Sequence, residues 1–365
     1  MGGVSNLTKK VWFQTGVAIL LALLIVKYVV EVQWLFDPLL IIAKTIFVPL
    51  LLGAVLFYVS EPLQRLLEKY KFPRWGSILF ILLTGAAAIW LFLSFIGPPI
   101  VDQVDNLAKN MPTLAKEVSN STEYLLQHRD DLPPQVSDWI ENAINSIQSI
   151  AVVFGKLVVS FFQSIFQAAF MAILVPFFFI FMLKDHEKFA PFITKFFTGE
   201  KKKWVQKTLS DIDNVLRTYI QGQLLISFLL ALIMYIGYRI IGLEYALLLV
   251  VFAFFMNVIP FIGPWIAFTP ALIVGFLQDP MMVIWVSLVT LVAQQTDSNL
   301  ITPNVMGKTL DIHPLTVITI ILAAGNIAGF MGILLAIPAY AVGKAVVKNI
   351  YERRKEIKAA ALKDV

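Results

Sequence analysis

Residues 11–30 read VWFQTGVAILLALLIVKYVV and form a predominantly apolar run directly after Lys9 and Lys10. Its length matches the roughly 20 residues that an α-helix needs to cross the hydrocarbon core of a bilayer. No A-x-A cleavage signal follows, so we expect a retained first membrane span and not a signal peptide. Further runs long enough to span lie at residues 39–59, 77–100, 150–183 and 219–241. The sequence therefore predicts a membrane protein with five spans before residue 242.

Beyond these spans the apolar pattern continues but is interrupted. Three more apolar segments lie at residues 245–277, 281–293 and 315–347. They are interrupted or separated by Pro, Gly, Asn, Gln and Asp residues. The fold class expected is an all-α integral membrane protein with about eight transmembrane or re-entrant helices.

The composition supports this class and excludes others. Hydrophobic residues make up 58% of the 365 residues and charged residues 15%, and the mean hydropathy is +0.79. Globular domains contain roughly 45–50% apolar and 25% charged residues. The net charge of +5 comes from basic residues beside apolar spans, as in any membrane protein, so we expect no nucleic-acid partner.

Catalytic and metal-binding motifs are not found in the sequence. There is no cysteine, and the three histidines, His128, His186 and His313, are scattered. A Walker motif, a G-x-S-x-G elbow, an H-E-x-x-H pair and a dinucleotide fingerprint are all missing. We therefore expect no enzyme activity, no cofactor and no metal.

The charges beside the spans predict the orientation. Residues 60–74 carry a net charge of +2, and residues 184–217 and the tail from Lys344 are also rich in Lys and Arg, so all three are expected in the cytoplasm. Residues 98–150 carry a net charge of −5 and are expected outside. Both termini are then cytoplasmic, and the location expected is a bacterial plasma membrane.

Two segments between the spans have helical apolar spacing. In the outward segment, residues 98–150, this spacing predicts amphipathic helices on or above the membrane. Residues 200–216 carry an apolar stripe that fits either an interfacial helix or ordinary packing against a cytoplasmic surface. The 34-residue run at 150–183 must tilt, extend past the membrane or kink at Pro176.

These features divide the chain into five expected parts. The parts are 1–97 (spans one to three), 98–150 (extracytoplasmic segment), 151–217 (long fourth span and cytoplasmic amphipathic helix), 218–347 (transport core with broken helices) and 348–365 (basic tail).

The first interruption of the apolar pattern lies around Asn257, Pro260, Gly263 and Pro264. The two prolines remove backbone donors and free the carbonyls of Met256 and Pro260, which lipid cannot satisfy. Transporters use such broken helices to bind solutes, whereas a packed kink or a turn between two short helices is the alternative.

The second interruption is the polar run from Gln294 through Gln295, Asp297 and Asn299, which continues to Pro303. Six consecutive polar residues cannot face lipid, so they line a cavity or leave the membrane as a solvated loop. If the helix persists, Gln294 and Ser298 share one face and Asp297 lies beside Gln294.

The third interruption contains Gly325, Asn326, Gly329 and Gly332. The spacing of Gly325 and Gly329 permits close approach of helices, with Asn326 available to hydrogen-bond across the contact. A turn between two half-helices is the other reading, because glycines also end helices.

At these residues the sequence resembles the AI-2E (autoinducer-2 exporter) family of bacterial inner-membrane proteins. The resemblance covers about half the chain, from Arg217 on. The motifs that carry it are Arg217-x-Tyr219-x-x-Gly222-Gln223, Asn257-x-Ile259-Pro260-x-Ile262-Gly263-Pro264, Gln294-Gln295 with Asn299-x-x-Thr302-Pro303, His313-Pro314-Leu315, and Gly329-x-x-Gly332 ending at Pro338.

The resemblance implies a permease of about eight spans that forms homo-oligomers. Some family members are associated with export of autoinducer-2, and others are described as sodium or lithium ion/proton antiporters. Many relatives have a glutamate after the paired glutamines, where this chain has Asp297 and Ser298, and this departure leaves the substrate open.

Three functional hypotheses follow. The first is a secondary transporter that exports a small polar solute such as autoinducer-2, and the second is a monovalent cation/proton antiporter. The third is a membrane scaffold that transports nothing. For transport, the expected substrate-binding residues are Asn257, Pro260, Gly263, Pro264, Gln294, Gln295, Asp297, Asn299 and Asn326, and the expected hinge or packing residues are Pro303, Gly325, Gly329 and Gly332.

Overall fold

The computed structural model describes residues 11–107, 109–110, 156, 158–164, 174–307 and 312–361. Every regular element among these residues is helical. The long helices are α2 (Val11–Glu31), α3 (Asp37–Lys69), α4 (Arg74–Leu91), α7 (Leu174–Thr194), α8 (Gly199–Ile240), α9 (Ala246–Asn257), α10 (Gly263–Gln278), α11 (Met282–Thr296) and α13 (Pro314–Ala361). Short elements are η1 (Gln33–Leu35), the π-helical turns η2 (Phe92–Ile96) and η5 (Asp297–Ile301), and α12 (Thr302–Met306).

Five helices in the described ranges are long and apolar enough to cross a membrane. They are Val11–Glu31, Asp37–Lys69, Arg74–Leu107, Gly199–Ile240 and Leu315–Lys355. These helices confirm the predicted all-α membrane class. Most of the predicted outward segment, and the middle of the apolar run at 150–183, lie outside the described residues.

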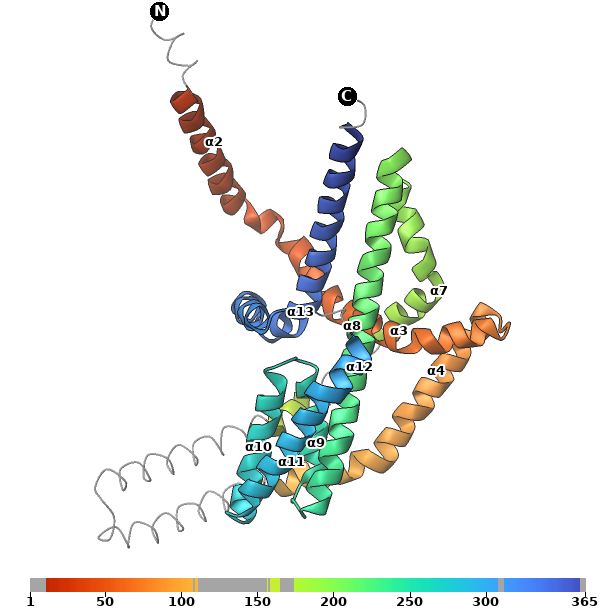
Figure 1. Cartoon of the computed structure of the whole chain (residues 1–365), viewed down its shortest axis with the longest axis vertical. Coiled ribbons are helices and arrows are strands. Elements are labelled where there is room, and N and C mark those ends of the chain that lie inside the picture. Colours follow the sequence, from red (N-terminus) through yellow and green to blue (C-terminus); the bar gives the residue numbers. More distant parts are fainter. Residues whose placement is uncertain are drawn as a thin grey trace, which may run out of the picture.

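Helix α8 is the centre of the arrangement, and it contacts α3, α7, α9, α11, α12 and α13 (Figure 1). Its 42 residues include the segment 200–216, so that segment is the start of one continuous helix. Leu216 and Ile220 of α8 pack against a hydrophobic cluster of α3, α4 and α7. Leu216, the last apolar residue of this segment, therefore packs against the rest of the protein.

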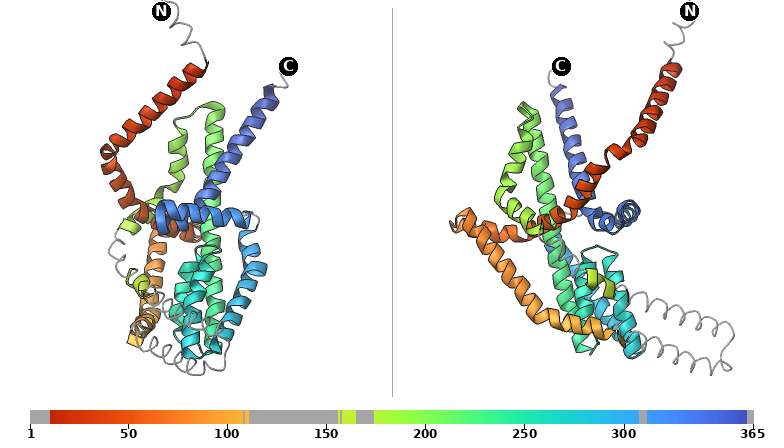
Figure 2. Two further views of the ribbon diagram at one scale, coloured as in Figure 1. Left: turned by 90° about the vertical axis from the view of Figure 1, so that its left-hand side faces the viewer. Right: turned by 180° about the vertical axis from the view of Figure 1, so that it is seen from behind.

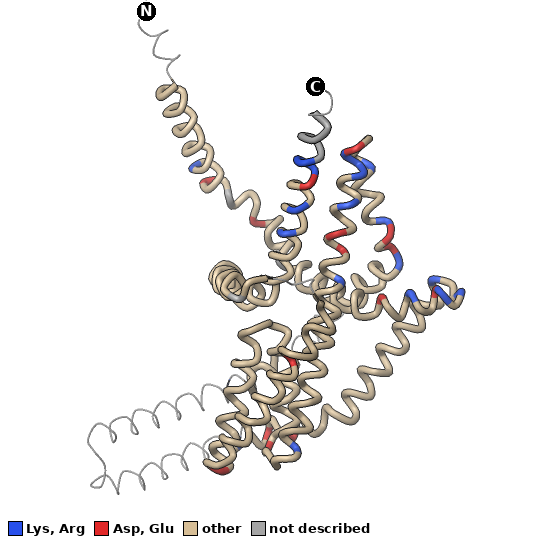
Figure 3. Tube along the Cα trace, viewed as in Figure 1, with Lys and Arg blue, Asp and Glu red and all other residues tan. Residues whose placement is uncertain are grey.

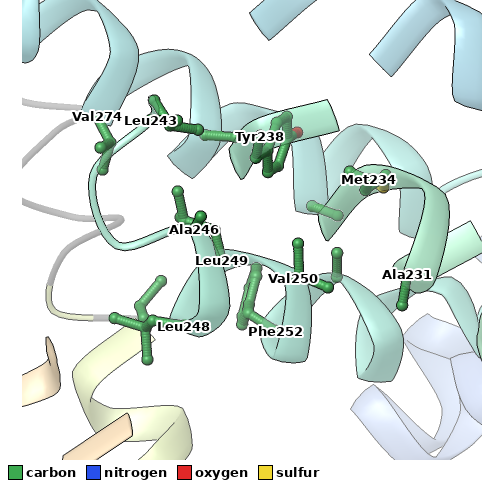
Figure 4. Close-up of a cluster of buried hydrophobic side chains, with 14 of the residues drawn as sticks. Ala231, Met234, Tyr238, Leu243, Ala246, Leu248, Leu249, Val250, Phe252 and Val274 are labelled. Atoms are coloured by element: carbon green, nitrogen blue, oxygen red, sulfur yellow. The ribbon is translucent and has the colours of Figure 1, made fainter. Parts of the chain in front are cut away.

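A second cluster lies on the other half of α8 and buries α9 almost completely. Eight of the twelve residues of α9 are buried, among them Leu248 and Phe252. They meet Met234 and Tyr238 of α8 and Val274 of α10 in one apolar core (Figure 4). A helix that is apolar on all sides, as α9 is, belongs inside a protein core.

The third cluster joins α8 to both parts of α13. Tyr219 and Ile226 of α8 pack with Val317 from the first part of α13 and with Ile337 from the second. Near the C-terminus, Asn349 of α13 donates to Asp211 of α8 (2.9 Å), and the Trp204 indole donates to the Asn349 carbonyl (3.2 Å). These contacts hold the C-terminal half of α13 along the first turns of α8.

Charge is distributed unevenly over this framework. Figure 3 shows Lys and Arg on the α7–α8 turn, on the C-terminal part of α13 and at the α3–α4 turn. Residues 246–296, which form α9, α10 and α11, contain no Lys or Arg. This separation is the one expected of a protein with one basic face outside the bilayer.

Helix α2 extends away from the remaining helices (Figure 2). None of its residues is buried, and the whole of its apolar window is exposed. Such a surface is stable only in an apolar medium, so lipid is its natural environment.

Candidate solute-binding site

The first wall of the site is the helical hairpin of α9 and α10, which pack against each other. At its base, the Gln278 side chain donates to the Gly242 carbonyl and accepts from the Glu244 amide, both at 2.9 Å. The two ends of residues 245–277 therefore lie together, and this unit folds back on itself.

The tip of the hairpin is a tight turn between Asn257 and Gly263. Phe261 has a positive φ of 65°, and a Cβ added to Gly263 would overlap the Met256 carbonyl oxygen. The Met256 and Pro260 carbonyls accept from the amides of Ile259 (2.9 Å) and Ile262 (2.8 Å). The turn itself thus supplies the donors for these carbonyls that lipid could not provide.

The second wall is the continuous helical stretch α11–η5–α12. The polar run from Gln294 remains helical instead of forming a loop, with a π-helical turn over Asp297–Ile301. Pro303 follows this turn, and a proline cannot donate to the carbonyl four residues earlier, which favours such a local widening. The Thr302 hydroxyl donates to Asp297 Oδ1 (2.7 Å) and fixes one carboxylate oxygen.

The third wall comes from α13, which is broken in its first third. Ala328 and Gly329 have non-helical dihedral angles, and Gly329 has a φ of 58°. A Cβ on Gly332 would overlap the Ala324 carbonyl oxygen, so the two parts of α13 touch at the break. The structure thus has a turn between half-helices, the second of the two readings of this glycine pattern.

These walls and α8 enclose a cavity of about 1050 Å³. Its polar lining consists of Gln223, Asn257, Ser287, Thr290, Gln294, Asp297, Ser298 and Thr302. Its apolar lining includes the aromatic side chains of Phe261, Trp265 and Phe268, along with Ile226, Leu230, Val317 and Ile337. Residues from every interrupted helix therefore meet α8 around one space.

Two amide side chains in this cavity have unused hydrogen-bonding atoms. Asn257 is 3% exposed, and both its Oδ1 and its Nδ2 are without a partner among the described residues. The same holds for Nε2 of Gln294. Gln223 is also buried, but its Nε2 donates to the Asn257 carbonyl (2.7 Å) and ties α8 to the hairpin tip. Two of the buried side chains with unpartnered atoms therefore line the cavity, one from α9 and one from α11.

Five of the nine expected substrate-binding residues line this cavity: Asn257, Pro260, Pro264, Gln294 and Asp297. The other four do not line it. Gly263 is buried in the hairpin turn, and Gln295 is exposed and joined to Asn299, whose Nδ2 donates to its side chain (3.1 Å). Asn326 is exposed and donates to the Leu322 carbonyl of its own helix (3.0 Å).

The expected hinge residues have distinct positions. Pro303 lies at the start of α12, and Gly329 is in the break of α13. Gly325 and Gly332 face the opposite part of α13 across that break.

Gln223, Ser287 and Thr290 line the cavity and were not expected there, whereas Ser298 and Thr302, which also line it, belong to the polar run expected at the site. Gln223 was visible as a polar residue inside an apolar span, the usual mark of a side chain that faces protein or a cavity. Thr290 carried no such signal, because its position opposite Tyr238, with the hydroxyls 3.1 Å apart, follows only from the packing of α11 on α8.

An ion-pair cluster around Arg217, two residues before Tyr219, joins α8 to α3. Arg217 Nε is 2.6 Å from Glu61 Oε2 of α3, and Arg217 Nη2 is 2.5 Å from Asp213. The Tyr58 hydroxyl donates to Asp213 (3.0 Å), and Gln221 donates to the Tyr58 carbonyl (2.6 Å). The Glu61 side chain is only 2% exposed, so this cluster fixes α3 against α8.

In the part of the chain that the structure describes, no group of three or more His, Asp or Glu side chains is placed to hold a metal ion. The cavity thus presents hydrogen-bonding groups, one carboxylate and aromatic surfaces to a ligand.

The chain is similar both to a known protein family and to individual relatives. The family described as "AI-2E family transporter" matches residues 16–352. The "Putative transport protein YueF" of Bacillus subtilis is 34% identical over 358 residues, which cover 94% of each chain. A second Bacillus subtilis protein, "Putative transport protein YrrI", is 29% identical and covers 96% of this chain and 99% of its own. "Putative permease PerM" of Escherichia coli K12 is 26% identical, over 82% of this chain and 86% of its own.

Proposed function

The chain belongs to the AI-2E transporter family, and we propose that it is a secondary transporter whose solute binds in the cavity between α8, the α9–α10 hairpin, α11 and α13. The observation that carries this proposal is the buried, unpartnered amide of Asn257 in the cavity wall. An unpaired buried polar group costs about 1–3 kcal/mol, and a hydrogen-bonding solute or water offsets that cost.

The named side chains suit distinct tasks in this proposal. Asn257 and Gln294 offer both donors and acceptors to a hydroxylated solute. Asp297, oriented by Thr302, offers a carboxylate that accepts hydrogen bonds or attracts positive charge. Broken helices around the site supply places where the backbone can change conformation.

The first candidate activity is export of a small polar solute such as autoinducer-2. The second is exchange of sodium or lithium ions for protons, which Asp297 favours because an antiporter needs a carboxylate that binds a proton and a cation in alternation. In both cases we propose a plasma-membrane protein with cytoplasmic termini, acting as a homo-oligomer.

Transport by purified protein in liposomes tests the proposal. Counter-flow of labelled autoinducer-2 and proton flux driven by sodium or lithium are measured in parallel. Asp297→Asn is expected to abolish ion-coupled proton flux but to leave partial counter-flow of a neutral solute. Glu244→Gln is the matched control, since this exposed acid lies at the base of the hairpin and outside the cavity. No accelerated exchange of any of these solutes by the wild-type protein contradicts the proposal.

A further inference from the structure

The cavity is larger and more apolar than a small sugar-like solute requires. Its volume of about 1050 Å³ lies just above the roughly 300–1,000 Å³ typical of ligand pockets. Fifteen of the 23 residues that line it are apolar. A ligand that fills this space must therefore bury a substantial apolar body as well as make polar contacts.

Aromatic side chains form one side of this cavity. Phe261 at the hairpin tip, and Trp265 and Phe268 on the first turns of α10, contribute rings from neighbouring positions. Trp265 is 71% exposed, so its ring is free to contact a ligand. Aromatic faces attract positive charge, and a cation within about 6 Å of a ring centroid is stabilised by about 0.5–2 kcal/mol.

The charge of the cavity lining also favours a cation as the ligand. Asp297 is the one ionisable side chain among the described residues of the lining, and Lys, Arg and His do not occur among them. Residues 246–296, which supply most of the walls, also contain no Lys or Arg. A charge in a low-dielectric site needs an opposite charge or several hydrogen bonds, so this lining suits a cation better than an anion.

We propose that the cavity takes an amphipathic organic cation, with its apolar body against Phe261, Trp265 and Phe268 and its positive group facing Asp297. This inference rests on the proposed transport function and names the substrate class of the same site. The amides of Asn257 and Gln294 hydrogen-bond any polar substituents of the ligand.

A bare sodium ion fits this lining less well. A small hard cation is held by several oxygen ligands close around it, and the lining offers a single carboxylate in a wide, largely apolar space. The shape and chemistry of the cavity thus match a cation that has a large apolar surface.

Binding of two ions of matched size and opposite charge tests the proposal. Equilibrium dialysis of the detergent-solubilised full chain measures binding of tetraphenylphosphonium and of tetraphenylborate, each corrected for binding to protein-free micelles. The wild-type protein is expected to bind the phosphonium at least about tenfold more tightly than the borate. Asp297→Asn should weaken phosphonium binding about tenfold, and Glu244→Gln should leave it unchanged.

A second variant separates the role of the aromatic side. Trp265→Ala, at an exposed position where folding is little affected, should weaken phosphonium binding several-fold. Three results would contradict the proposed substrate class. The wild-type protein could bind both ions equally or bind the borate more tightly, or Asp297→Asn could leave phosphonium binding unchanged. If Asp297→Asn cannot be purified, the wild-type preference between the two ions decides alone.

The liposome assay keeps this proposal separate from the transport function. If the protein transports autoinducer-2 or shows ion-driven proton flux but binds the two test ions equally, the proposed substrate class is wrong and the transport function stands. Absence of exchange for every solute, despite tight phosphonium binding, removes the transport function and leaves the binding site.

Discussion

Two groups of buried polar side chains meet α8, one around Arg217 and one around Gln223. Around Arg217, two acids have basic partners: Glu61 pairs with Arg217 and Arg65, and Asp213 pairs with Arg217. Six residues further along α8, Gln223 donates to the backbone carbonyl of Asn257, whose side-chain amide has no partner in the described structure. Paired groups fix helices in place, whereas the unpaired amide is the group that we propose a solute satisfies.

The first prediction at this scale concerns the Glu61–Arg217 pair. Glu61→Ala should lower the free energy of unfolding by about 3 kcal/mol, because it leaves the largely buried guanidinium of Arg217 without its α3 partner. Thermal unfolding of the purified protein in detergent measures this loss. Arg65→Ala removes an exposed partner of the same carboxylate and should cost less than about 1 kcal/mol. A wild-type melting curve for Glu61→Ala would show that the pair does not hold α3 to α8.

A second prediction uses pH. The Arg74 guanidinium donates to Glu187 (2.7 Å) and holds the pKa of that carboxyl below its usual range. Since a depressed carboxyl pKa stabilises the folded state above the unfolded pKa, the contribution is present above about pH 4.5 and is lost as pH falls through the lower folded value. Glu187 is largely exposed, so the effect should stay below about 1 kcal/mol.

The comparison needed is wild type against Glu187→Gln over a range of pH. Melting temperatures should differ at pH 6 and converge in acid, as pH falls through the lowered folded pKa of Glu187. A difference that persists unchanged in acid would mean that the ion pair with Arg74 is not its source.

At the scale of elements, three departures from a regular helix position the site, and each has a different cause. The hairpin tip depends on Pro260 and Gly263, the π-helical turn precedes Pro303, and the break of α13 falls at Gly329. All three were visible in the sequence as interruptions of apolar runs. Their shapes were not, because a proline or glycine shows where a helix is disturbed and only the packing decides how.

Two examples show why packing decides. Asn326 lies beside Gly325 and was expected at the site, yet the break places it on an exposed face. Thr290 looks like an ordinary residue of an apolar helix, yet the register of α11 against α8 brings it into the cavity. A one-residue rotation of either helix would exchange such faces, and sequence periodicity does not fix that rotation.

The contact across the α13 break gives a prediction with a control in the same helix. Gly332→Ala should destabilise the protein strongly, because the added methyl group overlaps the Ala324 carbonyl oxygen of the opposite part of α13. Gly343→Ala meets nothing within 4 Å and should be neutral or stabilise by up to about 1 kcal/mol through helix propensity. Yield of folded protein and melting temperature are the measurements. Equal behaviour of the two variants would contradict the close contact at the break.

On the scale of the whole molecule, α8 joins three hydrophobic clusters that use helices from distant parts of the chain. The individual apolar runs at 11–30, 39–59, 77–100 and 219–241 were predictable, because hydropathy alone identifies segments of bilayer length. Their arrangement around α8 was not, since lipid-facing and protein-facing residues of such helices are equally apolar. Helix α2, with no buried residue, and α9, mostly buried, have similarly apolar sequences.

The final prediction is the topology of residues after α8. Helix α9, with 12 residues, is about 18 Å long and α10, with 16 residues, is about 24 Å long, both shorter than the roughly 30 Å hydrocarbon core. We therefore predict that this hairpin enters the membrane and returns to the same side. Residues 282–306 form one helical stretch of about 37 Å, which is long enough to cross fully. That single crossing brings the chain to the side of the basic C-terminal segment.

Single cysteines introduced into the natural chain, which has none, test this path. Glu244→Cys and Asp279→Cys, at the two ends of the hairpin, should both react with a bulky membrane-impermeant thiol reagent added to intact cells. Lys202→Cys and Arg354→Cys, on the basic segments of α8 and α13, should react only after the membrane is permeabilised. All four positions are exposed, so accessibility reports sidedness and not burial. If Glu244→Cys and Asp279→Cys label from opposite sides, the hairpin does not return, and the cavity at its tip cannot lie within the membrane as proposed.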